Sequence, residues 1–405
     1  MKTMLSRVVR ALRLPVLPVL AVAGLCTAMS ALPGGTGAAH AADPIKVGLV
    51  ATLSGSSAKS GEAITRGLSL AIDEINAKGG VMGRKLELAS RDDESNPSKG
   101  LLAARELVQK ENAAVLFGGL ETPVSLAIVP FANKQKVPFI GPWAAGTPIT
   151  KNGADPNFVF RVSAVDEMVD QALVNYATKK YAAKKPGLIL INNPWGESNE
   201  KGLLKALEAK GIKPAGVEKF ENNDVDVTPQ LTRLKEAGAD ALFMVANVGP
   251  SSQVIKSLDR MGWNVPVVSH WGPAGGRFTE LAGPSAAKVE FIQTFTFSGN
   301  DSPKAKAVFD GLKAKYPEIK GPADVTPAVG VANAYDAMHM VAMAMEIAKS
   351  TSGPAIREAM YKIGQYDGLI KTYKTPFTPE NQDALGPEDY IFTHFVGNEI
   401  VPLAK

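Results

Sequence analysis

Cysteine is almost absent from this sequence of 405 residues. The single cysteine, Cys26, lies in the N-terminal segment that we expect to be removed. Because a disulfide needs two thiols, the mature chain is predicted to hold no disulfide and no cysteine-ligated metal. Its stability must then come from a packed apolar core. The 364 residues that follow position 41 are more than one core usually supports, which predicts two domains.

An excess of charge is also lacking once the N-terminal segment is set aside. The 44 Lys and Arg residues outnumber the 40 Asp and Glu residues by four, and four basic residues lie within the first 13 positions. They are Lys2, Arg7, Arg10 and Arg13. The rest of the chain is neutral, so it lacks the electrostatic footprint of a nucleic-acid-binding protein. We expect no nucleic-acid partner.

The motifs of common catalytic sites are missing as well. Three histidines remain beyond position 41, and none of them stands in the H-E-x-x-H spacing of a zinc enzyme: His270, His339 and His394. No G-x-S-x-G turn, P-loop or G-x-G-x-x-G fingerprint follows a predicted strand. The sequence therefore predicts no enzyme activity, no metal and no cofactor.

The first 41 residues have the order of a secretory signal peptide. The basic residues precede an apolar run, Leu14–Leu25, and small residues follow it as far as Ala39-His40-Ala41. We expect cleavage after Ala41 and export to the periplasm. A membrane anchor is the alternative, but two prolines interrupt a run that is shorter than the ~20 apolar residues of a spanning helix. A lipid anchor on Cys26 is a further alternative, although a large residue precedes it.

Short apolar runs alternate with helical patterns in the first half of the mature chain. The expected strands are Ile45–Ala51, Leu86–Ser90, Ala113–Phe117 and Pro138–Ile140. The expected helices are Glu62–Lys78, Pro97 to about Lys110, and Pro123–Asn133. Such an alternation predicts an α/β fold with a parallel sheet that helices cover on both faces.

After a loop at residues 141–157 the alternation restarts, which predicts a second α/β lobe. Its expected strands are Phe158–Val162, Gly187–Ile191, Val217–Phe220, Ala241–Val245 and Val265–Val268. Its expected helices are Asp166–Tyr181, Ser198–Lys210, Thr228–Ala237 and Ser251–Met261. From Pro303 the pattern is helical, with Lys304–Lys315 and a buried Ala328–Lys349.

One strand-to-helix junction has the chemistry of an anion site. The strand that ends at Gly118-Gly119 is followed by Thr122 and Pro123, which we expect to be the N-cap and first residue of a helix. A helix start offers free N–H groups, and at the carboxyl edge of a parallel sheet these suit a ligand carboxylate. An ordinary capped helix is the alternative. The Gly/Ala-rich segment Val137–Gly146 leads to the same edge.

Several segments, taken in order, resemble one family. They are Ile45-Lys-Val-Gly-Leu-Val, Leu53-Ser-Gly, Asp73-Glu-Ile-Asn-Ala-Lys-Gly-Gly, Asp92-Asp93, Pro194-Trp-Gly196 and Ala334-Tyr-Asp-Ala337. Their order and spacing, over essentially the whole mature chain, are similar to the leucine/isoleucine/valine-binding family of ABC importers, which are type I periplasmic binding proteins.

The resemblance implies two doubly wound parallel-sheet lobes joined by a hinge of three crossovers. Residues 42–161 with about 293–370 would form lobe 1, and residues 162–292 with about 371–405 would form lobe 2. A monomer of this kind traps a small-molecule solute between its lobes and delivers it to an ABC permease in the cytoplasmic membrane. The alternative role is a ligand-sensing receptor domain for a signalling partner.

Carried over by position, the resemblance also implies a binding site. Thr122 would hold a carboxylate of the solute, and Ala144 and Ala145 would offer backbone groups. The second-lobe aromatics Trp195 and Trp271, which we expect on loops, would close over the ligand. Packing between lobes or within the core is their alternative role. The remaining positions near the ligand are Asn247, Asn333 and Ser60.

The pattern departs from the family where the family's amino-acid binders place a second-lobe acid for the ligand ammonium. Trp271 stands at that position, and no acid occurs in Ser269–Arg277. The usual aromatic near Ser60 is absent, and Asn333 replaces another. Glu121 could supply the missing negative charge, or it could be a solvated acid that the helix start stabilises.

Overall fold

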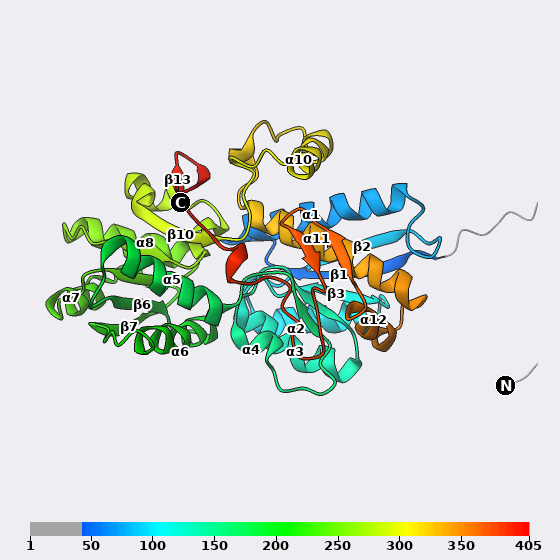
Figure 1. The fold of residues 1–405 in the computed structure, drawn as a ribbon, viewed down its shortest axis with the longest axis horizontal. Coiled ribbons are helices and arrows are strands. Elements are labelled where there is room, and N and C mark those ends of the chain that lie inside the picture. The colour runs from blue at the N-terminus through cyan, green and yellow to red at the C-terminus, as the bar shows by residue number, and fades with distance from the viewer. Residues whose placement is uncertain (1–42, 405) are drawn as a thin grey trace, which may run out of the picture. The chain divides into compact units, whose positions relative to one another are not determined.

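The computed structural model describes residues 43–404 of the chain. The predicted signal peptide and Cys26 lie outside the described residues. Within them the α/β fold class predicted from the sequence is confirmed, and the elements form two sheets flanked by helices (Figure 1). No helix among residues 43–404 is both long and apolar enough to cross a membrane.

The first sheet has five parallel strands in the order β2-β1-β3-β4-β5. These strands are β1 (Ile45–Ala51), β2 (Leu86–Asp92), β3 (Val115–Gly118), β4 (Phe139–Gly141) and β5 (Val159–Arg161). Along β1, Val47 and Leu49 belong to one apolar core and Val50 to another, because successive side chains of a strand point to opposite faces.

Helices cover both faces of this sheet. On one face α1 (Ala58–Ala77) packs along α11 (Ala328–Ala348), and the side chains of both join the core of Val47 and Leu49. On the other face α2 (Pro97–Gln109) packs along α3 (Thr122–Gln135) around Val50. Three further helices complete the surroundings of this sheet: α4 (Thr147–Thr150), α10 (Pro303–Lys315) and α12 (Gly353–Met360).

The second sheet has seven strands in the order β14-β13-β10-β9-β8-β6-β7. They are β6 (Gly187–Ile191), β7 (Gly216–Phe220), β8 (Leu242–Val245), β9 (Val267–Ser269), β10 (Val289–Gln293), β13 (Ile391–Val396) and β14 (Glu399–Pro402). The helices around it are α5 (Asp166–Tyr181), α6 (Pro194–Glu208), α7 (Thr228–Glu236), α8 (Val248–Arg260) and α9 (Phe278–Ala282). Strands β13 and β14 are antiparallel additions at one edge, so this sheet is mixed rather than purely parallel.

The alternation pattern assigned the strand at residues 158–162 to the second sheet, which is wrong, whereas the lobe limits implied by the resemblance place residues up to 161 in the first lobe. As β5 it pairs with β4 at the edge of the first sheet, and the second lobe begins with α5. The short strand is fully buried on both faces, so its apolar sequence does not indicate which sheet it joins.

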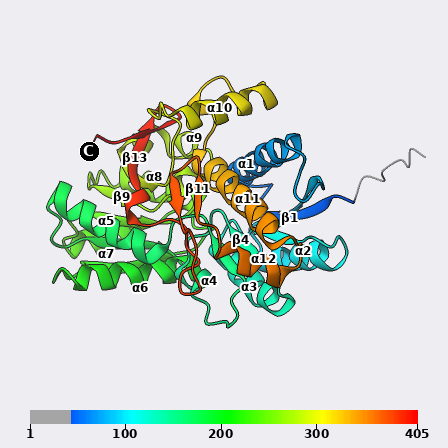
Figure 2. The ribbon, with the colours of Figure 1, turned by 45° about the vertical axis from the view of Figure 1, so that its right-hand side comes forward.

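The chain passes between the two sheets three times, as Figure 2 lets the reader follow. The first passage follows β5, the second follows β10, and the last lies between the hairpin β11 (Gln365–Asp367)–β12 (Thr372–Lys374) and β13. The Tyr373 hydroxyl donates to Asp336 on α11 at 2.9 Å. The lobe limits remain a proposal, and this contact favours a last passage after residue 374 rather than near 370.

Candidate functional site

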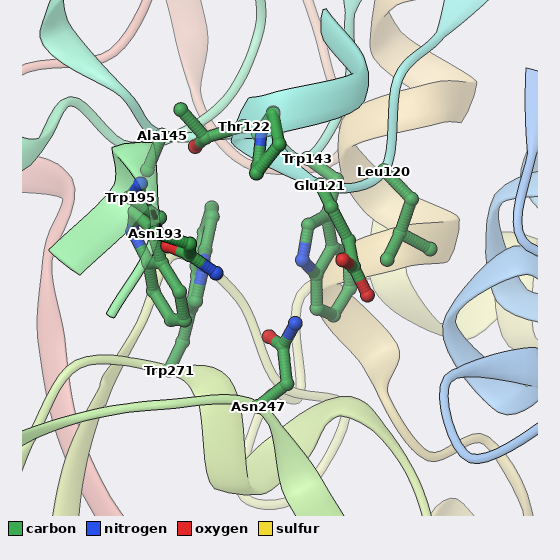
Figure 3. Close-up of a pocket in the computed structure, with 11 residues that line it drawn as sticks. Leu120, Glu121, Thr122, Trp143, Ala145, Asn193, Trp195, Asn247 and Trp271 are labelled. Carbon is green, nitrogen blue, oxygen red and sulfur yellow. Dashed lines mark hydrogen bonds between the residues drawn. The ribbon is translucent and has the colours of Figure 1, made fainter. Parts of the chain in front are cut away.

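A cavity lies where the carboxyl ends of strands from both sheets meet, which is the usual ligand position in α/β folds. It is enclosed by residues that follow β3 and β4 in the first sheet and β6, β8 and β9 in the second (Figure 3). Its lining residues are Leu120, Glu121, Thr122, Pro123, Trp143, Ala144, Ala145, Asn193, Trp195, Asn247 and Trp271.

Thr122 is the first residue of α3 and not its N-cap, so the predicted cap is wrong. Glu121 takes the extended N-cap conformation, and no side chain caps the helix. The Thr122 hydroxyl oxygen instead accepts a hydrogen bond from the Gly146 N–H at 3.2 Å. This bond ties the helix start to the loop after β4. The hydroxyl hydrogen has no acceptor among the described residues and can donate to a ligand.

The loop after β4 turns its carbonyl groups toward protein donors. The carbonyl oxygens of residues 142–146 accept, in chain order, from Asn333 Nδ2, Ser163 Oγ, Arg161 Nη1, the Asp166 N–H and again Arg161 Nη1. The distances from donor to oxygen are 2.9, 2.6, 3.3, 2.8 and 2.9 Å. These bonds fix the path of the backbone past the cavity.

Several backbone N–H groups at the cavity are left without a protein acceptor, and those of Thr122, Ala144 and Ala145 are among them. Ala144 and Ala145 are 2% and 1% exposed, and Thr122 is 3% exposed. Within residues 43–404 their N–H groups donate to no backbone or side-chain oxygen. Buried N–H groups without a partner are rare, because each costs about 1–3 kcal/mol. Three such donors around one cavity are typical of a site for an anionic ligand group.

The second-lobe wall begins with the first turn of α6. Asn193 is the N-cap, and its Oδ1 accepts from the N–H groups of Trp195 at 2.8 Å and Gly196 at 3.1 Å. Trp195 therefore lies on a helix and not on the loop that we expected. The Asn-Pro pair before this tryptophan is a helix-start signal, and it was overlooked in the sequence.

A buried hydrogen-bonded network joins Trp195 and Trp271 through Asp166 and His270. Trp195 Nε1 donates to Asp166 Oδ1 at 3.1 Å, and His270 Nε2 contacts the same oxygen at 3.1 Å. The Trp271 N–H donates to His270 Nδ1 at 2.8 Å. Nδ1 is thus an acceptor, and in the neutral ring the proton lies on Nε2 and is donated to Asp166. The network fixes the Trp195 indole and the Trp271 backbone, and the indole N–H of Trp195 is not available to a ligand.

Asn247 forms the floor of the cavity. It is the N-cap residue of α8, yet its side chain makes no capping hydrogen bond. Figure 3 shows the amide pointing into the space between the tryptophans. Because neither amide atom bonds another described residue, Asn247 offers a ligand one donor and one acceptor group.

Glu121 is the one ionisable side chain among the lining residues. Its Oε1 accepts from Ser95 Oγ at 2.9 Å and from Ser57 Oγ at 3.3 Å. Burial, with a further contribution from the negative charge of Asp93, raises the pKa of Glu121 to about 7, and the two hydroxyl groups oppose this shift. By surface area the residue is half-buried, and its role toward a ligand stays a prediction.

Trp143 also lines the cavity, although sequence reasoning did not single it out. Its ring centroid is 5.3 Å from that of Trp271, and the ring planes are tilted by 34°. The contact joins the two lobes beside the cavity. A large aromatic residue within the Gly/Ala-rich segment after a buried strand was the available signal.

Seven of the nine site residues inferred from the sequence line the cavity, and Ser60 and Asn333 do not. Ser60 Oγ donates to the Gly275 carbonyl oxygen of the other lobe at 2.7 Å. Asn333 Oδ1 accepts from Thr294 Oγ1 at 3.0 Å, while its amide nitrogen supports the loop after β4. Their contact with a ligand stays a prediction.

The comparisons with known proteins agree on one family. The sequence profile of the periplasmic binding protein family matches residues 44–387. A Leu/Ile/Val-binding protein homolog of Brucella melitensis is 25% identical over 81% of this chain and 85% of its own. The branched-chain amino acid transporter substrate-binding protein of Streptococcus pneumoniae, solved with isoleucine, has a TM-score of 0.75 and 26% identity over 89% of this chain and 100% of its own.

A solute-binding protein of an ABC transporter from Rhodopseudomonas palustris, solved with benzoate, has the same fold. Its TM-score is 0.74, and it is 24% identical over 89% of this chain and 95% of its own.

Proposed function

Because the chain belongs to the periplasmic binding protein family, we propose that it is the solute-binding component of an ABC importer and traps a small carboxylate-bearing solute between its lobes. It would act in the periplasm, as a monomer without catalytic activity, and pass the solute to a permease in the cytoplasmic membrane. The similar proteins solved with isoleucine and with benzoate both carry ligands with a carboxylate.

The observation that carries the proposal is the set of buried donors at the cavity. The N–H groups of Thr122, Ala144 and Ala145 and the Thr122 hydroxyl have no protein acceptor among the described residues. A carboxylate has two oxygens with about four acceptor positions, so it can accept hydrogen bonds from several of these donors at once. Hydrogen bonds to a charged acceptor contribute about 1.5–3 kcal/mol each, so the carboxylate would anchor the ligand to lobe 1.

The matching wall of lobe 2 would complete the enclosure. Trp195, Trp271 and Asn247 contact the same cavity from the opposite sheet. A ligand that touches both walls stabilises the closed arrangement, because it has more contacts there than in an open one. Release to the permease then requires only that the lobes separate.

Thermal unfolding of the exported, purified protein tests this function with pairs of ligands. Each pair would differ only at the carboxylate: isoleucine and isoleucinamide, benzoate and benzamide, trimethylglycine and its amide. We expect at least one acid to stabilise the protein, by about 2.7 kcal/mol at 100 times its dissociation constant, and its amide to bind at least tenfold more weakly. An amide that binds as tightly as its acid would refute carboxylate recognition.

Thr122→Val keeps the shape of the side chain and removes the hydroxyl. We expect a loss of affinity of about tenfold for the acid that binds. Thr65→Val is the matched control, because the Thr65 hydroxyl donates only to the Gly61 carbonyl oxygen within α1. Equal affinities of the two variants would remove the Thr122 hydroxyl from the site.

A further inference from the structure

The described residues that line the cavity carry one acidic side chain and no basic one. Among its described lining residues Glu121 is the only ionisable group, and none is a lysine, arginine or histidine. A simple acid such as benzoate would place its negative charge beside Glu121 with no cation to balance the two. A zwitterion would bring its own positive charge, and its carboxylate could still occupy the N–H donors of lobe 1.

The cavity offers few acceptors for a primary ammonium group, which carries three N–H donors. All five carbonyl oxygens of residues 142–146 are already bonded to protein donors. Asn193 Oδ1 accepts from two backbone N–H groups. Among the lining side chains, the acceptors without a protein donor are the second carboxylate oxygen of Glu121 and the Asn247 amide oxygen. The side chains thus supply two free acceptor atoms for the three N–H donors of a primary ammonium.

Three indole rings take up much of the remaining wall. Trp143, Trp195 and Trp271 come from both lobes, and Glu121 lines the same cavity (Figure 3). An ammonium whose hydrogens are replaced by methyl groups needs no acceptor, and it is attracted by the negative faces of aromatic rings, most strongly by tryptophan.

We propose that the cavity selects a small zwitterion with an N-methylated ammonium group, which the indole faces and Glu121 hold while the lobe-1 donors hold the carboxylate. This inference rests on the proposed function and narrows the solute class. The positive charge would then be recognised by an acid of the first lobe, at the start of α3, together with aromatic rings of both lobes.

The pH dependence of ligand affinity gives a second test of the inference, because it depends on the protonation of Glu121. Burial raises the pKa of Glu121 to about 7, and Asp93 is the other charged group that acts on it. A bound cation favours the ionised carboxylate, so binding would release a proton below pH 7. Affinity should rise with pH by up to tenfold per unit below 7 and level off above it. A neutral ligand would lack this dependence.

Isothermal titration with a matched series tests the proposal. The probes are glycine, its mono-, di- and trimethylated forms, isoleucine and benzoate. We expect affinity to increase with each methyl group, with trimethylglycine at least tenfold tighter than glycine, isoleucine and benzoate. Glu121→Gln should weaken trimethylglycine at least tenfold and abolish the pH dependence. Glu94→Gln is the matched control, since Glu94 is an exposed acid paired with Lys99.

The possible results distinguish a failure of this inference from a failure of the proposed function. If isoleucine or benzoate binds more tightly than trimethylglycine, or if Glu121→Gln leaves affinity for trimethylglycine unchanged, the inference is overturned and carboxylate binding stands. If no acid of either kind stabilises the protein, the proposed function fails and the inference fails with it.

Discussion

Arg161 gives the sharpest test of how the site is held in place. Its side chain is fully buried at the end of β5, with Nε 2.7 Å from Asp383 Oδ1. Its guanidinium also donates to Thr150 Oγ1 at 2.7 Å and to the carbonyl oxygens of Ala144 and Gly146. One residue thus neutralises a buried acid and positions the loop that presents the N–H donors to the cavity.

The cost of Arg161→Met can be worked out from these contacts. Asp383 is 2% exposed in its side chain, and after the substitution it would keep one side-chain donor, the Thr150 hydroxyl. Breaking a buried pair by removing one partner costs about 3–5 kcal/mol, because the other charge is left uncompensated. For a lobe of this size about 3 kcal/mol corresponds to a fall in melting temperature of at least about 6 °C.

Calorimetry and urea unfolding of the purified variants would measure this cost. The matched control is Arg233→Met, which breaks a surface pair with Glu218 in which the Arg233 side chain is 57% exposed, and which should leave the melting temperature nearly unchanged. The double variant Arg161→Met/Asp383→Leu should recover much of the loss, since no buried charge remains. Equal costs for Arg161→Met and Arg233→Met would refute the reasoning.

Two further substitutions probe the buried acids of the second lobe. Burial, then Asp166 and Glu167, raises the pKa of Asp170 well above its usual value, and neither of its oxygens has a partner among the described residues. An acid with a raised pKa in the folded state loses stability as pH rises above its unfolded pKa. Asp170→Asn should therefore stabilise the protein by about 1–3 kcal/mol at pH 8 and by less at pH 4 in urea titrations; a gain that does not depend on pH would contradict this. Trp195→Phe keeps an aromatic face but leaves Asp166 with His270 as its one side-chain donor, so unfolding free energy should fall by about 1–3 kcal/mol. Ligand affinity should fall less than in Trp195→Ala, and equal losses would show that the ring face does not contact the ligand.

Element positions were predictable wherever local patterns and packing agree. The strand at residues 45–51 and the helix at residues 166–181 have the bounds expected from the sequence. Sheet membership was harder to predict, because a short apolar run such as β5 looks alike at the edge of either sheet. The antiparallel strands β13 and β14 were missed, since Ile391–Pro402 alternates weakly and the preceding alternation predicts parallel pairing.

The site was predictable to the extent that ligand contacts follow strand ends. Thr122, Ala144 and Ala145 come directly after β3 and β4, so their place at the cavity follows from the topology. The hydrogen bond from Asn333 to the loop after β4 was not predictable, because a position on a helix does not indicate which loop the side chain supports. Whether Glu121 is solvated or buried depends on Ser57 and Ser95, which come from other segments of the chain.

The two walls of the cavity also explain why ligand and closure should be coupled. Three contacts already join the lobes beside the cavity: the Trp143–Trp271 ring pair, the Ser60–Gly275 hydrogen bond and one from the Thr147 N–H to Ser198 Oγ at 3.2 Å. They form between protein groups alone, so they lower the free energy of the closed arrangement even before a ligand binds. A ligand can shift the equilibrium only by its extra affinity for the closed form. Weakening the ring pair from the second lobe, by Trp271→Leu, should therefore reduce apparent affinity while the ligand contacts of the first lobe remain.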